Sequence, residues 1–503
     1  MAEMGFTRNF KPLDILTPDQ VEDIQKASLH VLANTGVTFE DAQARALLAE
    51  HGCQVDEDKR RVRFPESLVQ ESLEKTLGRF RIRARDEEQD LDAGNPDKFY
   101  FVASCGLNSI DLDTWQPKRP TRKEFYDFVK VLDALPNVHL LPAFPWWGFD
   151  KVPQVMSLLE SNAAKIRMCT KVQGEGSVVG DDKWTVEMGR AVGIDLYQLV
   201  NPTAPLTYTA DTSQKLINYT GDELVYGFCS GPVPGATAPA TAAGGLVTGN
   251  AEHLAGVVLA NLVKPGPRVI SANMTMMQNM KTGAPYFSQA GSMALDGAFH
   301  QVWRDYGFPS WTTTPAWTGS KAIDFQAAYE VAMAATTAAL YGASFAVFQG
   351  GLTQQLIAHP VKAILDDDIA GMVGRILQGV DVSEQTLALD VIEEVGPLPG
   401  TFLTTAHTRK LWRKEQYVPQ VADHLSQEDW LKAGSLTAFD HARAKMEQIL
   451  ATHQPVPLPP EQEQAIEDIL NDARQYFRKQ GMISDEEWEL YQQDLSSPDY
   501  PVA

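Results

Sequence analysis

The feature that most constrains this chain is a repeated alternation of strand-like and helix-like segments between about residues 139 and 378. Short apolar runs rich in branched and aromatic residues are followed by longer stretches with helical periodicity. Repeated strand–helix units in one chain produce a parallel sheet with helices packed against it. Seven runs are predicted as strands: 139–144, 166–172, 205–209, 224–229, 268–274, 310–314 and 345–349.

The remaining choice is between a closed barrel and an open, doubly wound sheet. No GxGxxG motif follows a predicted strand, and no GxxxxGK[ST] motif is present, so the usual evidence for a nucleotide-binding open sheet is missing. An eighth strand at 99–103 would complete a barrel. We therefore predict an α/β fold, a (β/α)₈ TIM barrel whose functional residues lie at the carboxyl ends of the strands.

Both ends of the chain are predicted to be helical additions to this barrel. Start and stop signals near the N-terminus predict three helices. Short strand-like runs at 80–85, 99–103 and 108–113 suggest a small antiparallel decoration that caps one barrel end, although 99–103 is also the candidate for the eighth barrel strand. After Gly400 the chain predicts a helix over 426–452, a proline-rich linker, two short helices and a loosely held tail. The expected organisation is a head with its decoration, a catalytic barrel and a C-terminal extension: 1–120, 121–400 and 401–503.

Composition excludes several classes of partner. The formal net charge is −22, with 65 acidic and 43 basic residues, which argues against nucleic acid because phosphate contacts need clustered Lys and Arg. The four cysteines contain no CxxC pair, so we interpret them as reduced core thiols of a cytoplasmic protein. No signal-peptide pattern opens the chain, and no run approaches the roughly 20 apolar residues of a membrane span.

Aromatic residues gather near the predicted carboxyl ends of the strands. A ring of aromatic faces at a barrel mouth can hold a quaternary ammonium group by cation–π attraction, at ~0.5–2 kcal/mol for each ring. The alternative is that these rings only fill the barrel and its loops. The candidates for a cation site are Trp146, Trp147, Tyr208, Trp311, Trp317 and Phe348.

Polar candidates are fewer. The histidines show no metal-site spacing, but His359, in a loop after the last strand, is placed to bind an anionic group, unless it simply faces solvent. Gln349 and Gln326 could order substrate or loop. The successive Asp366, Asp367 and Asp368 point about 100° apart on a helix, so we interpret them as helix-dipole charge rather than as a metal site.

Several long motifs resemble the trimethylamine methyltransferase (MttB) superfamily. They are PGATAPAT (234–241) with NAEHLAGVVLANLVKPG beyond it, GSKAIDFQAAYE running into VAMAATTAALYGA, DDDIAGMVGRILQGVDV, and the shorter LDILTPDQ and LPNVHLLPAF. The resemblance covers most of the chain. It implies a TIM-barrel enzyme that moves a methyl group from a methylated amine to the cob(I)alamin of a separate corrinoid-binding protein, with no tightly bound cofactor and no metal of its own.

One departure narrows the implied substrate. The founding members of the superfamily carry pyrrolysine just before the SK of GSKAIDFQAAYE, whereas this loop reads PAWTGSK, with Thr318 or Gly319 at that place. The chain therefore resembles the non-pyrrolysine branch, whose substrates are quaternary amines such as glycine betaine, proline betaine and carnitine. A quaternary nitrogen leaves as a neutral tertiary amine, so no general acid is needed.

The sequence thus predicts methyl transfer from glycine betaine, releasing dimethylglycine. The aromatic residues named above would bind the cation and His359 the carboxylate, while Pro234, Gly235, Ala236 and Thr237 would line the mouth where the corrinoid docks. Another betaine, or a betaine-binding sensor without activity, is the alternative. We expect a homo-oligomer with no nucleic-acid or membrane partner.

Overall fold

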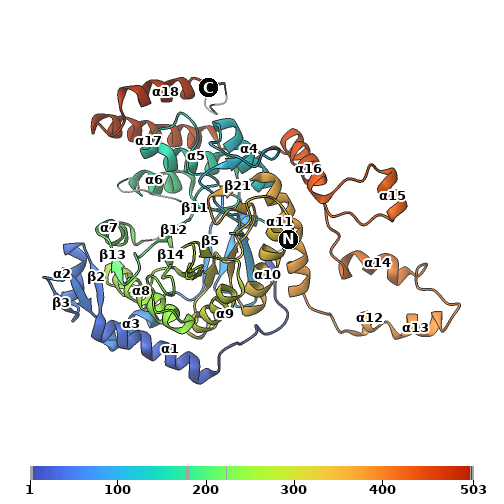
Figure 1. Ribbon diagram of the computed structural model, residues 1–503, viewed down its shortest axis with the longest axis horizontal. Coiled ribbons are helices and arrows are strands. Elements are labelled where there is room, and N and C mark those ends of the chain that lie inside the picture. Colours follow the sequence, from blue (N-terminus) through green and yellow to red (C-terminus); the bar gives the residue numbers. More distant parts are fainter. Residues whose placement is uncertain (1–3, 176–179, 181, 222–223, 499, 501–503) are drawn as a thin grey trace.

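A closed barrel of eight parallel strands forms the centre of the molecule (Figure 1). The computed structural model describes residues 4–175, 180, 182–221, 224–498 and 500. The barrel closes because β19 pairs in parallel with β7, through Phe345–Tyr100 and Val347–Val102. In chain order its strands are β7 (Lys98–Val102), β10 (Leu140–Leu141), β11 (Val172–Glu175), β12 (Leu196–Val200), β14 (Leu224–Ser230), β15 (Val269–Asn273), β18 (Ser310–Thr312) and β19 (Phe345–Val347). The predicted TIM barrel is confirmed.

One helix follows each barrel strand and covers the outside. These helices are α4 (Arg122–Ala134), α5 (Ser157–Met168), α6 (Asp182–Val192), α7 (Ala210–Tyr219), α8 (Ala242–Val263), α9 (Ala290–Asp305), α10 (Phe325–Tyr341) and α11 (Pro360–Leu377). By length and hydropathy alone α8 could span a membrane, contrary to our expectation that no segment would, but 78% of its most apolar stretch is buried. The N-terminal helices pack against α8, so α8 is a core helix of this fold.

The end of the barrel at the strand N-termini is closed by a hairpin. β5 (Phe80–Ile82) pairs antiparallel with β6 (Leu91–Ala93). The apolar side chains of this hairpin, including Ile82 and Leu91, pack in one cluster with barrel residues such as Val225 and Ile270. A decoration at a barrel end was predicted, but only 80–85 belongs to it: 99–103 overlaps the barrel strand β7, and 108–113 contains β8 (Ser109–Ile110), which pairs with β9 (Pro117–Lys118). The hairpin leaves the opposite end, where the strands terminate, for the site.

The N-terminal head packs against α8. Its helices are α1 (Pro18–His30), extended by a π-helical turn over Val31–Thr35, α2 (Ala42–Glu50) and α3 (Glu66–Lys75). Thr17 caps α1 with a capping box completed by Gln20. A small sheet accompanies these helices, formed by β2 (Val37–Phe39), β3 (Gln54–Asp56), β4 (Arg61–Arg63) and β13 (Thr207–Tyr208).

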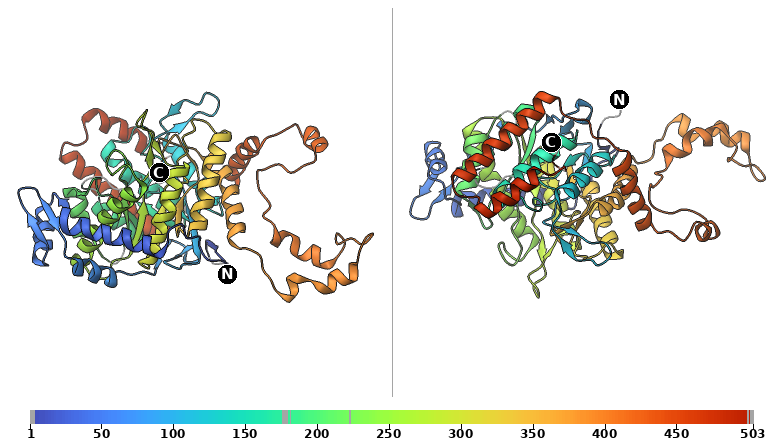
Figure 2. Two further views of the ribbon diagram at one scale, coloured as in Figure 1. Left: turned by 60° about the horizontal axis from the view of Figure 1, so that its bottom comes forward. Right: turned by 90° about the horizontal axis from the view of Figure 1, so that it is seen from above.

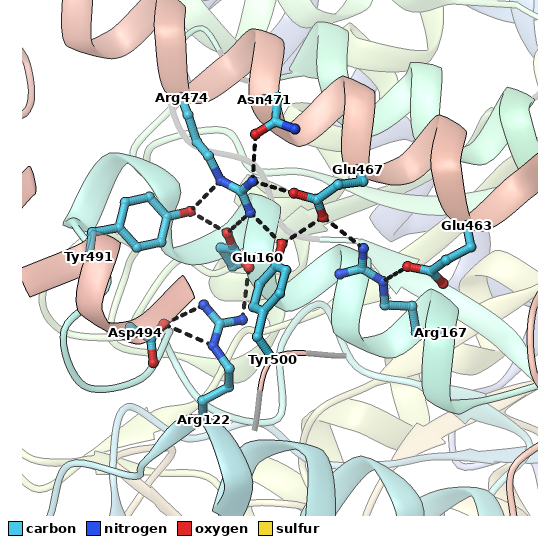
Figure 3. A network of polar contacts seen from close by, with 10 residues as sticks. All are labelled: Arg122, Glu160, Arg167, Glu463, Glu467, Asn471, Arg474, Tyr491, Asp494 and Tyr500. Atoms are coloured by element: carbon cyan, nitrogen blue, oxygen red, sulfur yellow. Dashed lines mark hydrogen bonds and ion pairs between the residues drawn. The ribbon is translucent and has the colours of Figure 1, made fainter. Parts of the chain in front are cut away.

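A buried network of charges fixes the last two helices to the barrel (Figure 3). α17 (Pro460–Lys479) and α18 (Asp485–Leu495) pack beside α4, α5 and α6. Glu160 of α5 accepts hydrogen bonds from Arg122 (3.0 Å) and from Arg474 (2.6 Å). Burial alone would raise the pKa of Glu160, but Arg122 and Arg474 outweigh burial and hold this pKa well below its usual range.

The tail is anchored by the same network. The hydroxyl of Tyr500 donates to Glu467 at 2.6 Å and accepts from Arg474 at 2.6 Å, and the Tyr500 side chain is buried. The prediction of a loosely held tail was wrong for this residue, because aromatic and charged partners lie far away in sequence. The preceding proline-rich linker is also held, since Arg85 donates to the carbonyls of Val456 and Pro457.

Between α11 and α17 the chain leaves the barrel and returns. α12 (Glu384–Leu387), α13 (Leu389–Val395), α14 (Ala406–Glu415) and α15 (Gln427–Lys432) extend to one side in every view (Figures 1 and 2). α16 (Ala438–Thr452) then packs on α11 and α4. The helix predicted over 426–452 is thus two helices, because the chain turns at Gly434, whose φ is +96°.

Two predicted barrel strands were wrong. Residues 166–168 end helix α5 rather than beginning a strand, and only Val172 of the predicted segment lies in β11. The charged residues at this helix end are buried: Lys165 donates to the carbonyl of Pro142, and Arg167 donates to Glu463 of α17.

The second wrong strand is 205–209. It forms β13, which pairs with β2 of the head and not with the barrel. The true strand in its place, β12, carries a Tyr–Gln pair in an apolar run and was missed. A seven-strand count from sequence therefore included one strand of another sheet.

The acidic run at 366–368 is buried rather than a helix-dipole charge. Asp366 pairs with Lys362, Asp367 accepts from Asn137, and Asp368 accepts backbone N–H groups of 420–422. The three carboxylates point in different directions, as expected. Asp366 also accepts the backbone N–H of Gly350, so each carboxylate joins α11 to a different segment outside this helix. Among the described residues no three His, Cys, Asp or Glu side chains are grouped as metal ligands.

Candidate active site

A cavity of about 230 Å³ lies inside the barrel at the carboxyl ends of its strands. Ligand sites of TIM barrels are found at this end. The cavity is smaller than the ~300–1,000 Å³ of sites for drug-sized ligands, which suits a substrate of few atoms. Its wall combines aromatic side chains with one carboxylate: Phe144, Trp147, Tyr197, Trp311, Trp317 and Glu175.

Three tryptophans reach the cavity from two places in the barrel. Trp311 lies in β18, in register with Ala272 of β15 and Phe345 of β19, and its indole points into the barrel. Trp317 follows on the loop after β18, where its indole donates to Ser104 Oγ at 3.1 Å and packs edge-on against Phe287. The short segment from Trp311 to Trp317 therefore supplies two of the three indoles.

The third tryptophan is held by the loop after β10. The backbone N–H of Trp147 donates to the carbonyl of Gly106 at 3.1 Å, and the backbone N–H of Gly106 donates to the carbonyl of Pro145 at 3.0 Å. This exchange binds the loop to the segment that follows β7. The Trp147 ring, half-buried, meets Phe144 edge-on at 5.0 Å between ring centroids and lines the cavity.

Glu175, the last residue of β11, is the acidic group of this wall. Its side chain is 2% exposed, and neither carboxylate oxygen makes a hydrogen bond of ordinary geometry among the described residues, although Lys215, Lys165 and Gln198 lie near enough to lower its pKa in part. Burial raises the pKa of Glu175. A buried carboxylate without donors costs free energy, so its presence in a cavity indicates a partner of positive charge.

A lysine lies under this carboxylate but does not bond it. Lys165 Nζ donates to the carbonyl oxygens of Pro142 (2.9 Å), Ala143 (2.6 Å) and Gly174. Three acceptors match the three hydrogens of an ammonium group, although burial lowers the pKa of Lys165. The lysine is thus committed to holding the strand ends, and Glu175 remains available to the cavity.

Two hydrogen-bond donors complete the cavity. The indole Nε1–H of Trp311 and the hydroxyl of Tyr197 are buried without a partner among the described residues. Their rings lie 5.9 Å apart, and both line the cavity. Buried Trp and Tyr polar atoms normally have a partner, so this pair is suited to donate hydrogen bonds to an anionic group of a ligand.

The wall therefore presents aromatic faces and a carboxylate, together with two donors that have no partner in the part of the chain that the structure describes. This combination suits a small zwitterion whose cation has no N–H groups. The aromatic faces and the charge of Glu175 attract such a cation without a hydrogen bond. Sequence comparisons agree with an enzyme of methylated amines. A family model described as trimethylamine methyltransferase (MTTB) matches residues 2–477.

The chain belongs to the trimethylamine methyltransferase family. It is 31% identical over 459 residues to the glycine betaine methyltransferase of Desulfitobacterium hafniense (strain Y51), covering 89% of this chain and 94% of that protein. It is 27% identical over 497 residues to the trimethylamine methyltransferase MttB of Methanosarcina barkeri (strain Fusaro / DSM 804), covering 95% and 99%. The resemblance inferred from motifs is confirmed, and the protein is a methyltransferase.

Within this methyltransferase, three of the aromatic candidates lie away from the cavity. Trp146 points opposite to its neighbour Trp147, packs on Phe128 and donates to the carbonyl of Ala358 at 2.9 Å. Phe348 follows β19 and faces outward onto Phe101. The reason is the same for both, since consecutive side chains of extended backbone point to opposite faces.

Tyr208 is the third of these aromatic residues. It stacks on Phe39 of the head at 4.9 Å, and its hydroxyl donates to the carbonyl of Glu252. It was assigned to a barrel strand that does not exist, so its expected position at a strand end was wrong. Its ring joins the head to α8 instead.

The polar candidates also lie outside the cavity. His359 is the N-cap of α11, where Nδ1 accepts the N–H of Val361 at 3.1 Å, and burial lowers the pKa of His359 to about 4. A neutral, capped imidazole is a poor partner for a carboxylate. Gln349 is buried and donates to the carbonyl of Asn137, while the exposed Gln326 donates to Glu330 at 2.9 Å.

The segment expected to face the corrinoid is a compact turn after β14. The carbonyl of Val233 accepts the N–H groups of residues 236, 237 and 238, and Gly235 adopts a φ of +90°. Pro234 is buried, whereas Gly235 and Ala236 are exposed and Thr237 is half-buried. The turn lies at the barrel end that contains the cavity, which keeps it a candidate for that role.

Proposed function

We propose that this protein transfers a methyl group from glycine betaine to the cob(I)alamin of a separate corrinoid-binding protein, releasing dimethylglycine. The single observation that carries this proposal is the carboxylate of Glu175, which makes no hydrogen bond to any described residue and lies within a wall of tryptophans. The identity of 31% to a protein named glycine betaine methyltransferase supports the same substrate. Proline betaine, carnitine and a sensor without activity have no such support.

The polar ends of the betaine fit the two parts of the cavity. In the proposed complex the trimethylammonium group lies among Trp147, Trp317 and Glu175, which together offer cation–π attraction and charge. The betaine carboxylate accepts from Trp311 Nε1 and from the Tyr197 hydroxyl, the two donors without partners among the described residues. His359 is not needed for this step.

The loop before Ser320 explains the preference for a quaternary amine. Where founding members of the family carry pyrrolysine, Thr318 Oγ1 and the N–H of Gly319 both donate to Glu330, the latter at 2.8 Å. This loop therefore turns its small residues away and sends Trp317 into the cavity. We infer that an indole face replaces a reactive side chain, which a substrate with a fixed positive charge does not require.

The chemistry asks little of the protein beyond position. The partner's cobalt supplies the electron pair that forms the new bond to the methyl carbon, and the C–N bond breaks with its electrons returning to nitrogen. Nitrogen thereby becomes neutral, so no proton has to be donated to the leaving group. The walls of this chain hold one N–CH₃ bond in line and exclude water.

An absorption assay tests the proposal. Purified protein, cob(I)alamin and one amine at a time are mixed, with and without the cognate corrinoid protein, and the methylated corrinoid is followed by its spectrum. We expect methylation and dimethylglycine from glycine betaine and none from trimethylamine. If no quaternary amine methylates the corrinoid, even with the corrinoid protein present, the proposed methyl transfer is wrong and a betaine-binding sensor is favoured.

A further inference from the structure

The segment 380–414 extends from the barrel and buries almost nothing. We call it the arm; it contains α12, α13 and most of α14. All of its residues are described, and Ala388 is the only buried one. Figures 1 and 2 show the arm standing clear of the barrel in three directions of view.

The arm is nevertheless built as an ordered element. Ser383 closes a capping box on α12, and Thr405 caps α14 by accepting from the N–H of Thr408. At its base Arg375 of α11 donates to the carbonyls of Gly379 (2.8 Å) and Glu415 (2.9 Å), which holds the two ends of the arm together. The arm has capped helices and a fixed base but no hydrophobic core of its own. Short helices are not stable without packing, so we infer that another molecule packs against the arm.

The apolar content of the arm exceeds that of a solvated loop. Five large aliphatic side chains of the arm are more than three-fifths exposed: Val380 (82%), Val382 (73%), Leu389 (63%), Leu398 (92%) and Leu403 (84%). Exposed apolar surface on this scale marks an interaction site. The arm alone is longer than the roughly 20–30 residues that each side contributes to a standard protein interface.

The same chain carries an apolar surface that could receive such an arm. On α10, Phe325, Tyr329 and Met333 are exposed at four-residue spacing and so form one stripe. On the adjacent α11, Met372 and Ile376 are exposed in the same way. α10 and α11 pack together and lie on the side of the barrel from which the arm extends (Figures 1 and 2).

Charge also favours a second copy of this chain. α14 carries Arg409, Lys410, Arg413 and Lys414, all exposed, against a single acidic residue, Glu415. The whole chain has a net charge of −22. The cationic end of the arm is attracted to the anionic surface of another copy, whereas the part before α14 is acidic, with Asp381, Glu384, Asp390, Glu393 and Glu394.

We propose that the arm docks on the exposed faces of α10 and α11 of a second copy, and that the second copy's arm docks in return. Such an exchange is isologous and closes on itself. The arm leaves from the C-terminal end of α11, and an outer helix of a barrel ends at the face opposite the strands' carboxyl ends. The exchange therefore leaves the cavity mouth free for the corrinoid protein.

Sedimentation velocity on the full chain tests the proposal. We expect a mass of at least two chains of 55.5 kDa each. A deletion of 381–414, joined by a short Gly–Ser linker, should lower that mass, because Arg375 already holds the two ends close. Leu403→Asp on the arm and Met372→Asp on α11 should each weaken association at least ten-fold, and both change exposed side chains that folding does not need.

The matched control is Val456→Asp, an equally exposed valine in the proline-rich linker that should leave the mass unchanged. A full chain that sediments as a single copy overturns the proposal. So does an arm deletion, or either point variant, that keeps the mass of the intact protein. Protection of arm amides from hydrogen exchange that depends on the corrinoid protein, and not on protein concentration, would assign the arm to that partner instead.

Discussion

Lys165 donates to the carbonyl of Gly174, while the next residue, Glu175, receives no donor among the described residues and lines the cavity. The two charged groups are neighbours inside the barrel, yet the lysine is satisfied by main-chain oxygens from two strand ends. A carboxylate left open in this way is unfavourable in the empty protein. We infer that the cation of the substrate completes it.

Replacing this carboxylate should weaken binding of cations selectively. Glu175→Gln keeps the shape but removes the charge, so we expect at least ~1.5 kcal/mol less binding free energy, about ten-fold in Kd, for glycine betaine. Calorimetric titration measures this change. The control ligand is 3,3-dimethylbutanoate, which has a neutral tert-butyl group, and its affinity should not fall. Equal losses for both ligands would remove Glu175 from the cation site.

Binding of glycine betaine should strengthen as pH rises through the neutral range. Burial raises the pKa of Glu175, so its carboxyl group is neutral at lower pH and ionised at higher pH. Only the ionised form attracts the cation, whose own charge does not titrate. Titration of Kd against pH checks this, with Glu175→Gln as the control that should show a flat profile. A flat profile in the intact protein would contradict the assignment.

Matched variants can distinguish a tryptophan that lines the cavity from one that is buried in the core. Trp317→Phe removes an indole from the cavity wall, and we expect a loss of ~0.5–2 kcal/mol in binding with little change in Tm. Trp146→Phe is the control, since Trp146 is equally buried but faces Phe128 and Ala358. It should lower Tm and leave binding unchanged. The reverse pattern would return Trp317 to the core.

The donor of Trp311 can be tested by ligand choice. Trp311→Phe keeps a ring but removes Nε1–H, so we expect glycine betaine to lose ~1.5–3 kcal/mol, about ten- to hundred-fold in affinity. Tetramethylammonium has no carboxylate and should bind the variant almost as it binds the intact protein. The ratio of the two affinities is the measurement. An unchanged ratio would show that the betaine carboxylate lies elsewhere.

The buried network around Glu160 predicts acid lability. Arg122 and Arg474 hold the pKa of Glu160 well below that of an unfolded glutamate, ~4.3. The folded protein therefore keeps this charge, and its contribution to stability is complete above about pH 4.3 and is lost as pH falls through the folded pKa. Thermal unfolding between pH 6 and 3 measures the loss, expressed as Tm.

Glu160→Gln is the corresponding variant. Breaking a buried ion pair on one side costs ~3–5 kcal/mol, and the acid slope should become shallower because the titrating group is gone. Proteolysis should then release α17 and α18, which this residue joins to α4 through Arg122. An unchanged acid slope would mean that other carboxylates control unfolding at low pH.

The fold could be predicted because its signals are local and repeated. The capping boxes at Thr17 and Thr121, the apolar stripe of each outer helix and the β-branched strands all appear in sequence as they are in the structure. The errors arose where charged residues are buried. Lys165 and Arg167 look exposed in sequence, but their partners come from strand ends and from α17, far away in the chain.

The site was only partly accessible from sequence. Trp147, Trp311 and Trp317 were chosen for their position after strands and do line the cavity. The other two aromatic candidates next to strand ends, Trp146 and Phe348, point away from the cavity. Each is one residue away in sequence from a residue that lines it, and successive side chains of extended backbone point to opposite faces. Glu175 and Tyr197 were missed because β11 was placed too early and β12 was not found. Glu175 ends the short strand VQGE, in which Val172 is the one apolar side chain, so the sequence there carries little strand signal.

A crystal structure of the protein with glycine betaine bound shows directly where the substrate lies. We expect the trimethylammonium group among Trp147, Trp317 and Glu175, and the betaine carboxylate within hydrogen-bond distance of Trp311 Nε1. Betaine bound outside the barrel, or inside it with its carboxylate toward Glu175, would overturn the proposed function of this cavity.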